Sequence, residues 1–268
     1  MFNLKYPSET QLRYAQSVLP FPEHIIIQLL IEADDETFNR LCSSDQFKSF
    51  CSINSTFSER IYDERAKRLV ERQFSKDLIQ FKPADMKWRE FYIKMKYVID
   101  HIDNLDPNIL AEQGMLFQLK MLYEIKGEIP NQEGINLTAK NGRLDVLRWI
   151  YEKLGSIGLP DQEGLYLAAG QGQLEVLKWI FSINGALPFD LVWIARQGYL
   201  DVLKWIYSIN RSLPDQEGIA LAAGNGQLDV LKWIYEINHQ LPVESAVEFA
   251  ESRGHFDVGE WVRSKRNN

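Results

Sequence analysis

Residues 221–238 read LAAGNGQLDVLKWIYEIN, and the second part of this stretch recurs along the chain. Related copies of it surround five tryptophans: Trp149, Trp179, Trp205, Trp233 and Trp261. The intervals between them are 30, 26, 28 and 28 residues, which indicates one supersecondary unit repeated in tandem. Repeats of this length stack into solenoids, and we therefore expect a surface that binds another macromolecule.

A glycine marks the same place in every unit and extends the repeat to six copies. These glycines are Gly114, Gly142, Gly172, Gly198, Gly226 and Gly254, the first of them in a degenerate copy. Each unit passes from a short apolar segment through the glycine into a longer one, which predicts two helices joined by a tight turn. The predicted units cover residues 106–133, 134–163, 164–189, 190–217, 218–245 and 246–268.

The longer segment carries apolar residues at steps of three or four, as Leu228, Leu231 and Ile234 show, and this spacing predicts one buried helix face. Between units, the phrase LPDQEG (residues 159–164 and 213–218) places a proline where one helix stops and an aspartate that can cap the next. Four units also place an acid three residues before a base. These predict exposed ion pairs within one helix: Asp145–Arg148, Glu175–Lys178, Asp201–Lys204 and Asp229–Lys232.

The phrase LAAxxGQLDVLKWI resembles the core of the ankyrin repeat, which reads LHLAAxxGHLEVVKLLL. The resemblance covers roughly 160 residues and implies an all-α solenoid that binds a protein. The unit here has about 28 residues instead of about 33, and the ankyrin Thr-Pro-Leu-His tetrapeptide is missing, so we expect the β-hairpin fingers to be shortened or absent. Short, tryptophan-rich arrays of this kind resemble those of amoebal giant viruses and some protists. The last unit predicts a cap, because it has polar residues at Glu248, Glu251, Glu260 and Arg263.

The N-terminal residues do not follow the repeat, and the apolar spacing of residues 21–57 predicts three short helices. The string FPEHIIIQLLIEADDETFNRLCSSDQFKSFCSINSTF is similar to an F-box, with Phe21 and Pro22 on the opening Leu-Pro pair and Cys42 on the Leu-Cys step. His24 takes the place of the family's glutamate, and Phe57 stands where tryptophan is usual. The resemblance implies docking on the Skp adaptor of a cullin-RING ubiquitin ligase through Phe21, Pro22, Ile25, Ile26, Leu29 and Leu30.

The predicted organisation is an F-box-like module at residues 1–60, a helical bridging segment at residues 61–105 and the repeats at residues 106–268. In the bridging segment, one helix face carries Trp88, Phe91, Tyr92 and Met95. Two interpretations of the first module stay open. It recruits the ligase, which makes the chain a substrate receptor, or its helices only cap a scaffold built from the repeats.

Composition limits the possible partners and compartments. A net charge of -7 and an isoelectric point near 5.3 disfavour a nucleic-acid partner. The longest apolar run, Ile25 to Ile31, is too short to cross a membrane, and we expect no membrane partner. Cys42 and Cys51 are nine residues apart, on nearly opposite faces of an unbroken helix, which disfavours a disulfide. We expect a reducing, cytoplasmic location, the host cytoplasm for a viral chain, with the nucleus left open.

No motif indicates catalysis. The histidines His24, His101, His239 and His255 are far apart without a cysteine or acid at metal-ligand spacing, so we predict no metal site, no cofactor and no enzyme activity. The five tryptophans could form a platform for stacking a ligand, but their place near the buried stripe favours packing between repeats. Trp193 replaces the leucine found at Leu167 and Leu221 and predicts a widened joint between two repeats.

Positions that vary between similar repeats are those that packing leaves free, so they are candidates for partner binding. The candidate partner-binding residues are Asn136, Lys140, Arg143, Tyr166, Arg196, Gln197, Tyr199 and Arg253. Among them, Tyr166, Arg196 and Tyr199 are of the residue types enriched in interface hot spots. The sequence therefore predicts a non-enzymatic adaptor, in which the repeats capture an unidentified protein and the first module engages a ubiquitin ligase.

Overall fold

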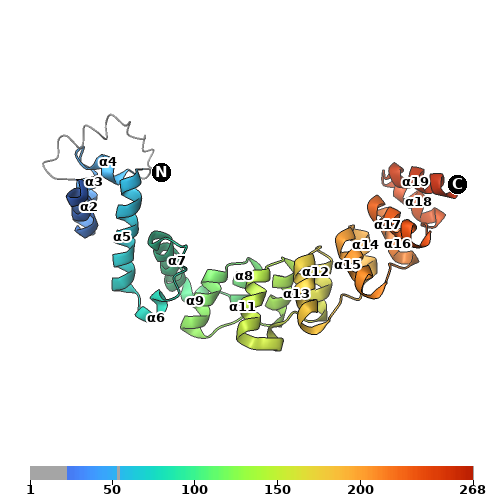
Figure 1. Ribbon diagram of the computed structural model, residues 1–268, viewed down its shortest axis with the longest axis horizontal. Coiled ribbons are helices and arrows are strands. Elements are labelled where there is room, and N and C mark those ends of the chain that lie inside the picture. The colour runs from blue at the N-terminus through green and yellow to red at the C-terminus, as the bar shows by residue number, and fades with distance from the viewer. Residues whose placement is uncertain (1–22, 53–54, 268) are drawn as a thin grey trace. The chain divides into compact units, whose positions relative to one another are not determined.

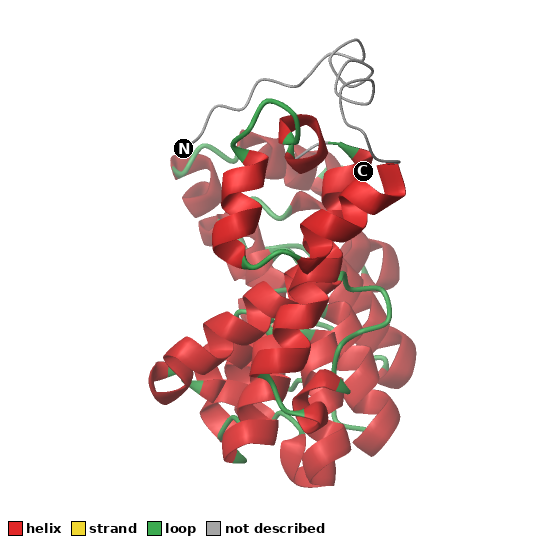
Figure 2. Ribbon diagram, turned by 90° about the vertical axis from the view of Figure 1, so that its left-hand side faces the viewer, coloured by secondary structure: helices red, strands yellow, loops and turns green. Residues whose placement is uncertain are grey.

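The computed structural model describes residues 23–52 and 55–267, and within these ranges the chain forms helices and loops with no strand (Figure 2). The helices pack in series, as expected for an all-α helical repeat. The chain divides into two compact units, Met1–Ile102 and Asp103–Asn268. The predicted all-α solenoid is thus confirmed.

The described part of the first unit contains the three predicted short helices, α2 (Glu23–Glu32), α3 (Asp35–Cys42) and α4 (Lys48–Cys51), followed by α5 (Thr56–Gln73). Its core includes Ile26, Leu30 and Phe50, which are all but inaccessible to solvent. Asp34 caps α3 by accepting a hydrogen bond from the Thr37 backbone N–H at 2.7 Å. A separate buried cluster therefore holds these helices together.

Helix α5 continues through residue 60, where the sequence analysis ended the first module. The unit is completed by α6 (Lys76–Ile79) and α7 (Trp88–His101), and η1 (Ile102–Asn104) follows. Helix α5 packs against both α2 and α7. On the α2 side, the Arg65 guanidinium donates to the carbonyls of Leu30, in the last turn of α2, and of Ala33, just after it, at 2.9 and 2.5 Å.

The prediction of unpaired cysteines was wrong. Cys42 and Cys51 form a disulfide, with their Cα atoms 5.5 Å apart. The prediction assumed one continuous helix, but α3 ends at Cys42 and the chain turns before α4 begins at Lys48. The disulfide removes the argument from cysteine usage for a reducing location.

The second unit is a row of helix pairs, in each of which a turn leads from a first helix into a second helix (Figure 1). First helices of successive pairs lie side by side at every joint but one. The first helices are α8 (Pro107–Glu112), α10 (Gln132–Lys140), α12 (Gln162–Ala169), α14 (Leu191–Gln197), α16 (Gln216–Gly224) and α18 (Glu244–Ser252). The second helices are α9 (Leu116–Lys126), α11 (Leu144–Leu154), α13 (Leu174–Asn184), α15 (Leu200–Asn210), α17 (Leu228–Asn238) and α19 (Phe256–Arg266). A short helix, η2 (Gly155–Gly158), follows α11.

The segments that connect successive repeats cap the next helix, as predicted, at three joints. Asn131, Asp161 and Asp215 cap the following first helix by accepting hydrogen bonds from its backbone N–H groups. Helices α10, α12 and α16 therefore begin two residues before the predicted units at 134, 164 and 218. Asp190 caps the shorter α14 in the same way.

The five tryptophans pack between repeats, as predicted. Each ring lies edge-on to an aromatic ring of the preceding repeat, with ring centroids 5.7–6.0 Å apart and interplanar angles of 84–90°. The pairs are Tyr123–Trp149, Tyr151–Trp179, Phe181–Trp205, Tyr207–Trp233 and Tyr235–Trp261. Edge-to-face contacts of this kind add about 0.5–1.5 kcal/mol to the burial of the rings, so the tryptophan row is a structural ladder.

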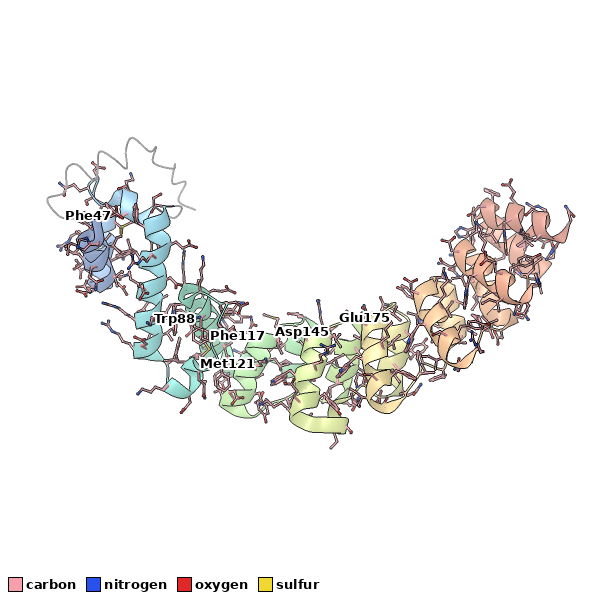
Figure 3. The ribbon with its side chains drawn as sticks, viewed as in Figure 1. Phe47, Trp88, Phe117, Met121, Asp145 and Glu175 are labelled. Carbon is pink, nitrogen blue, oxygen red and sulfur yellow. A yellow bond between two sulfur atoms is a disulfide. The ribbon has the colours of Figure 1, made fainter. Side chains whose placement is uncertain are left out.

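Of the four predicted ion pairs within second helices, only Glu175–Lys178 forms, with Oε1 and Nζ 2.9 Å apart. The prediction was wrong for the other three, all of which lie among the described residues. Exposed charges gain little from pairing, because solvent screens them and side-chain entropy opposes a fixed geometry. Figure 3 shows two of these acids, Asp145 and Glu175, near the beginnings of neighbouring second helices.

The last repeat has the polar outer face predicted for a cap. Arg263 of α19 pairs with Glu251 of α18, and Arg266 pairs with Glu244 and also donates to the Pro242 carbonyl. Gly259 stands where the other second helices have leucine, because a Cβ there would lie 1.9 Å from the Glu251 carboxylate. Charged side chains thus cross the surface on which a further repeat would stack.

We expect the Glu251–Arg263 pair to make the stability of the second unit depend on pH. The hydrogen bond from Arg263 holds the pKa of Glu251 below its ordinary value. Because the folded-state pKa is depressed, the stabilisation is present above the unfolded value of about 4.3 and is lost as the pH falls through the folded value. Glu251→Gln should lower the melting temperature at neutral pH, and this difference should shrink in acid. An equal difference at every pH would contradict the prediction.

Candidate partner-binding surface

One joint between repeats is wider than the others. Among the described first helices, α12 and α14 are the only successive pair whose backbones do not approach closely along their length. The Trp193 ring fills this joint and stacks on the Tyr166 ring, with centroids 6.2 Å apart and an interplanar angle of 25°. The wide joint predicted from Trp193 is thus confirmed. The Trp193 side chain itself is half-buried and not fully enclosed.

Arg196 completes a small cluster at this joint. Its guanidinium lies over the Trp193 ring, 5.1 Å from the centroid, in a cation–π contact. Arg196 is exposed, while Tyr166 and Trp193 are half-buried. We call these three residues the joint cluster. It offers aromatic surface and a positively charged group side by side, which are features of interface hot spots.

A glycine of α12 makes room for the joint cluster. A Cβ at Gly170 would lie 2.2 Å from the Trp193 Nε1 atom, so the ring packs directly on the Gly170 backbone. Trp193 was predicted to lie at this joint, but its partner Gly170 was not predicted. The sequence does carry a signal for this contact. The third repeat has Gly170 where the second repeat has Lys140, and the fourth repeat has Trp193 where the third has Leu167.

Tyr199 belongs to a different, structural row. It follows the turn glycine of its repeat and packs on Gly172, the turn glycine of the preceding repeat, where a Cβ would lie 2.5 Å from its Cδ1 atom. The equivalent residues pack in the same way on the preceding turn glycine: Arg143 on Gly114, Gln173 on Gly142, Gln227 on Gly198 and His255 on Gly226. Different side chains at this position therefore cover the equivalent glycine of the preceding repeat. Tyr199 and Arg143 are partly held by this packing.

Asn136 is not available to a partner. Its side chain is 4% exposed, and its amide nitrogen donates to the Asp161 carboxylate at 2.8 Å. Its amide oxygen accepts hydrogen bonds from the Gln132 side chain and the Asp161 backbone. The assignment of Asn136 to the binding surface was wrong, because packing satisfies a polar group that the sequence alone leaves unexplained.

The remaining candidates lie near the turns. Gln197 and Arg253 are exposed and Lys140 is half-buried. The Arg253 guanidinium lies over the Phe249 ring, 5.5 Å from its centroid. Phe249, which the sequence analysis did not select, is 52% exposed.

In the first unit, α2 separates the predicted adaptor-binding residues into two sets. Ile26 and Leu30 lie in the core, while Ile25 and Leu29 are 43% and 42% exposed. Phe21 and Pro22 lie outside the described residues. The exposed pair is one helical turn apart, so it forms an apolar strip on a helix whose opposite face is buried.

Neither comparison with known proteins gives a match: no protein-family model fits this chain, and no curated protein resembles it significantly. The assignment of a function therefore depends on the surfaces described above.

The described residues offer little for other kinds of site. They include no group of three histidine, cysteine, aspartate or glutamate side chains that could hold a metal ion. A hollow of about 310 Å³ beside α7 is lined by charged groups that are already engaged, such as Lys87 with Glu59 and the Arg89 backbone with Asp63. No helix within the described ranges has the length and apolar character needed to span a membrane.

Proposed function

We propose that this chain is a non-enzymatic adaptor, in which the helical repeats capture a target protein and the F-box-like module at residues 1–60 recruits a Skp-cullin type ubiquitin ligase. The observation that carries the ligase half is the exposed apolar strip of Ile25 and Leu29 on α2. In the resemblance to an F-box, the strip falls on the helix that docks on the adaptor. Each of its two residues keeps more than two fifths of its surface exposed, so a partner can bury further apolar surface there.

The joint cluster supports the capture half. Arg196, Trp193 and Tyr166 lie together at the one wide joint, where the packing of repeats leaves side chains partly accessible. Aromatic and arginine side chains held in place by stacking lose little entropy on binding. A protein partner fits this chemistry.

Binding of purified Skp adaptor to the intact chain, measured by calorimetry, tests the ligase half. We expect Ile25→Asp combined with Leu29→Asp to weaken binding by at least about 30-fold, because charged groups would replace an apolar contact with the adaptor. Thermal unfolding shows whether the variant keeps its fold. Ile93→Asp is the matched control, since Ile93 is an exposed apolar residue of α7 in the same unit. It should bind like the unmodified chain.

Absence of binding by the intact, folded chain would contradict the ligase half and favour the alternative, a scaffold whose N-terminal helices serve only as a cap. Equal weakening by Ile93→Asp would show that the effect does not depend on the strip on α2.

A further inference from the structure

The arrangement of glycine, aromatic ring and arginine occurs twice in the repeats. At the first site the Trp193 ring packs on Gly170 and carries Arg196. At the second site the Phe249 ring approaches Gly224, where a Cβ would lie 2.8 Å from its Cδ1 atom, and carries Arg253. The two glycines, and the two rings, occupy equivalent positions in repeats that are two units apart.

Both guanidinium groups lie over an aromatic ring. Neither arginine lies within ion-pair distance of a carboxylate among the described residues, although the chain carries a net charge of -7. Glu251, two residues before Arg253 in the sequence, pairs instead with Arg263. The arginines therefore keep their charge available for an external anion.

We propose that the row of first helices binds an extended acidic segment of a partner protein, with one carboxylate on Arg196 and a second on Arg253. Apolar parts of the same segment would cover the half-buried Trp193 ring and the exposed Phe249 ring. This inference rests on the proposed function of the repeats as a capture surface. It adds the chemistry of the segment that is captured.

The repeat geometry sets the spacing of the two carboxylates. Neighbouring packed helices are about 8–10 Å apart, so sites two repeats apart are separated by about 20 Å. An extended peptide advances about 3.3 Å per residue, which puts the two acids about six residues apart. A helical partner segment would need about 13 residues for the same distance, so the spacing distinguishes the two forms.

Selection from a displayed library of random peptides of about 16 residues, long enough to span both sites, tests the proposal. The immobilised bait is the full-length chain. We expect the enriched peptides to carry aspartate or glutamate in pairs about six residues apart. Binding of an enriched peptide should fall at least about tenfold in Arg196→Glu combined with Arg253→Glu, since each charge reversal removes an attraction and adds a repulsion.

Lys204→Glu combined with Lys232→Glu is the matched control. It makes the same change of net charge on the exposed sides of α15 and α17, away from the two sites, and should leave peptide binding unchanged. Thermal unfolding of each variant shows whether the fold is intact. A single-stranded oligonucleotide, which could also stack on aromatic rings beside arginine, is the second probe.

Peptides without paired acids, peptides that bind the arginine variant as well as the unmodified chain, or failure to enrich any peptide would overturn the proposal. So would tighter binding of the oligonucleotide than of any peptide through the same arginines. The ligase half of the proposed function is tested separately, by Skp adaptor binding to α2. Peptides that bind the repeats independently of Arg196 and Arg253 would still support capture by the repeats. Failure of this inference is therefore distinguishable from failure of the proposed function.

Discussion

Replacing Trp149 by alanine should lower the free energy of unfolding of the repeats by about 3–5 kcal/mol, the usual cost of deleting a buried tryptophan side chain. Trp149 is only 6% exposed, and its ring lies edge-on to Tyr123 with centroids 5.7 Å apart. The deletion removes the aromatic contact between the first two repeats and leaves a cavity. Urea unfolding followed by circular dichroism measures the loss.

The control for this variant is Trp193→Ala. Trp193 is half-buried and lies in the wide joint between α12 and α14, so its removal should cost clearly less than the removal of Trp149. It should instead weaken partner binding, because the Arg196 guanidinium loses its support. If the two substitutions cost the same, Trp193 is as much a part of the structural framework as the tryptophans of the ladder.

Tandem repetition explains why much of the second unit could be predicted from sequence. Five copies of one pattern reveal which residues every joint needs, and the aromatic pairs and the aspartate caps follow from that. The first unit has no such redundancy. Ser43 and Ser44 end α3 by turning their hydroxyl groups back onto the Asn39 and Leu41 carbonyls, a signal too weak to reveal the break that brings Cys42 to Cys51.

The candidate surface was harder to predict, because variation between repeats has two causes. At Arg196 the side chain varies because packing leaves it exposed. At Tyr199 and Asn136 it varies because different side chains meet the same structural demand, covering a glycine in one case and joining a hydrogen-bond network in the other. A single sequence does not separate these causes, since both depend on contacts with the neighbouring repeat.

The contact beneath Tyr199 can be isolated by substitution of two glycines. Gly172 and Gly185 both have a left-handed backbone, with φ of +69° and +73°. A Cβ at Gly172 would collide with the Tyr199 ring, whereas a Cβ at Gly185 meets nothing within 4 Å. Gly185→Ala should therefore cost only the left-handed conformation of an L-residue, about 1 kcal/mol.

Gly172→Ala should cost about 3 kcal/mol, because displacement of a packed ring adds to the same conformational penalty. The difference in the free energy of unfolding between the two variants, measured by urea unfolding, reports the Tyr199 contact alone. Combining Gly172→Ala with Tyr199→Ala should recover part of the loss, since the smaller side chain leaves room for the new methyl group. Equal costs for Gly172→Ala and Gly185→Ala would show that Tyr199 moves aside freely, and would return it to the candidate partner-binding residues.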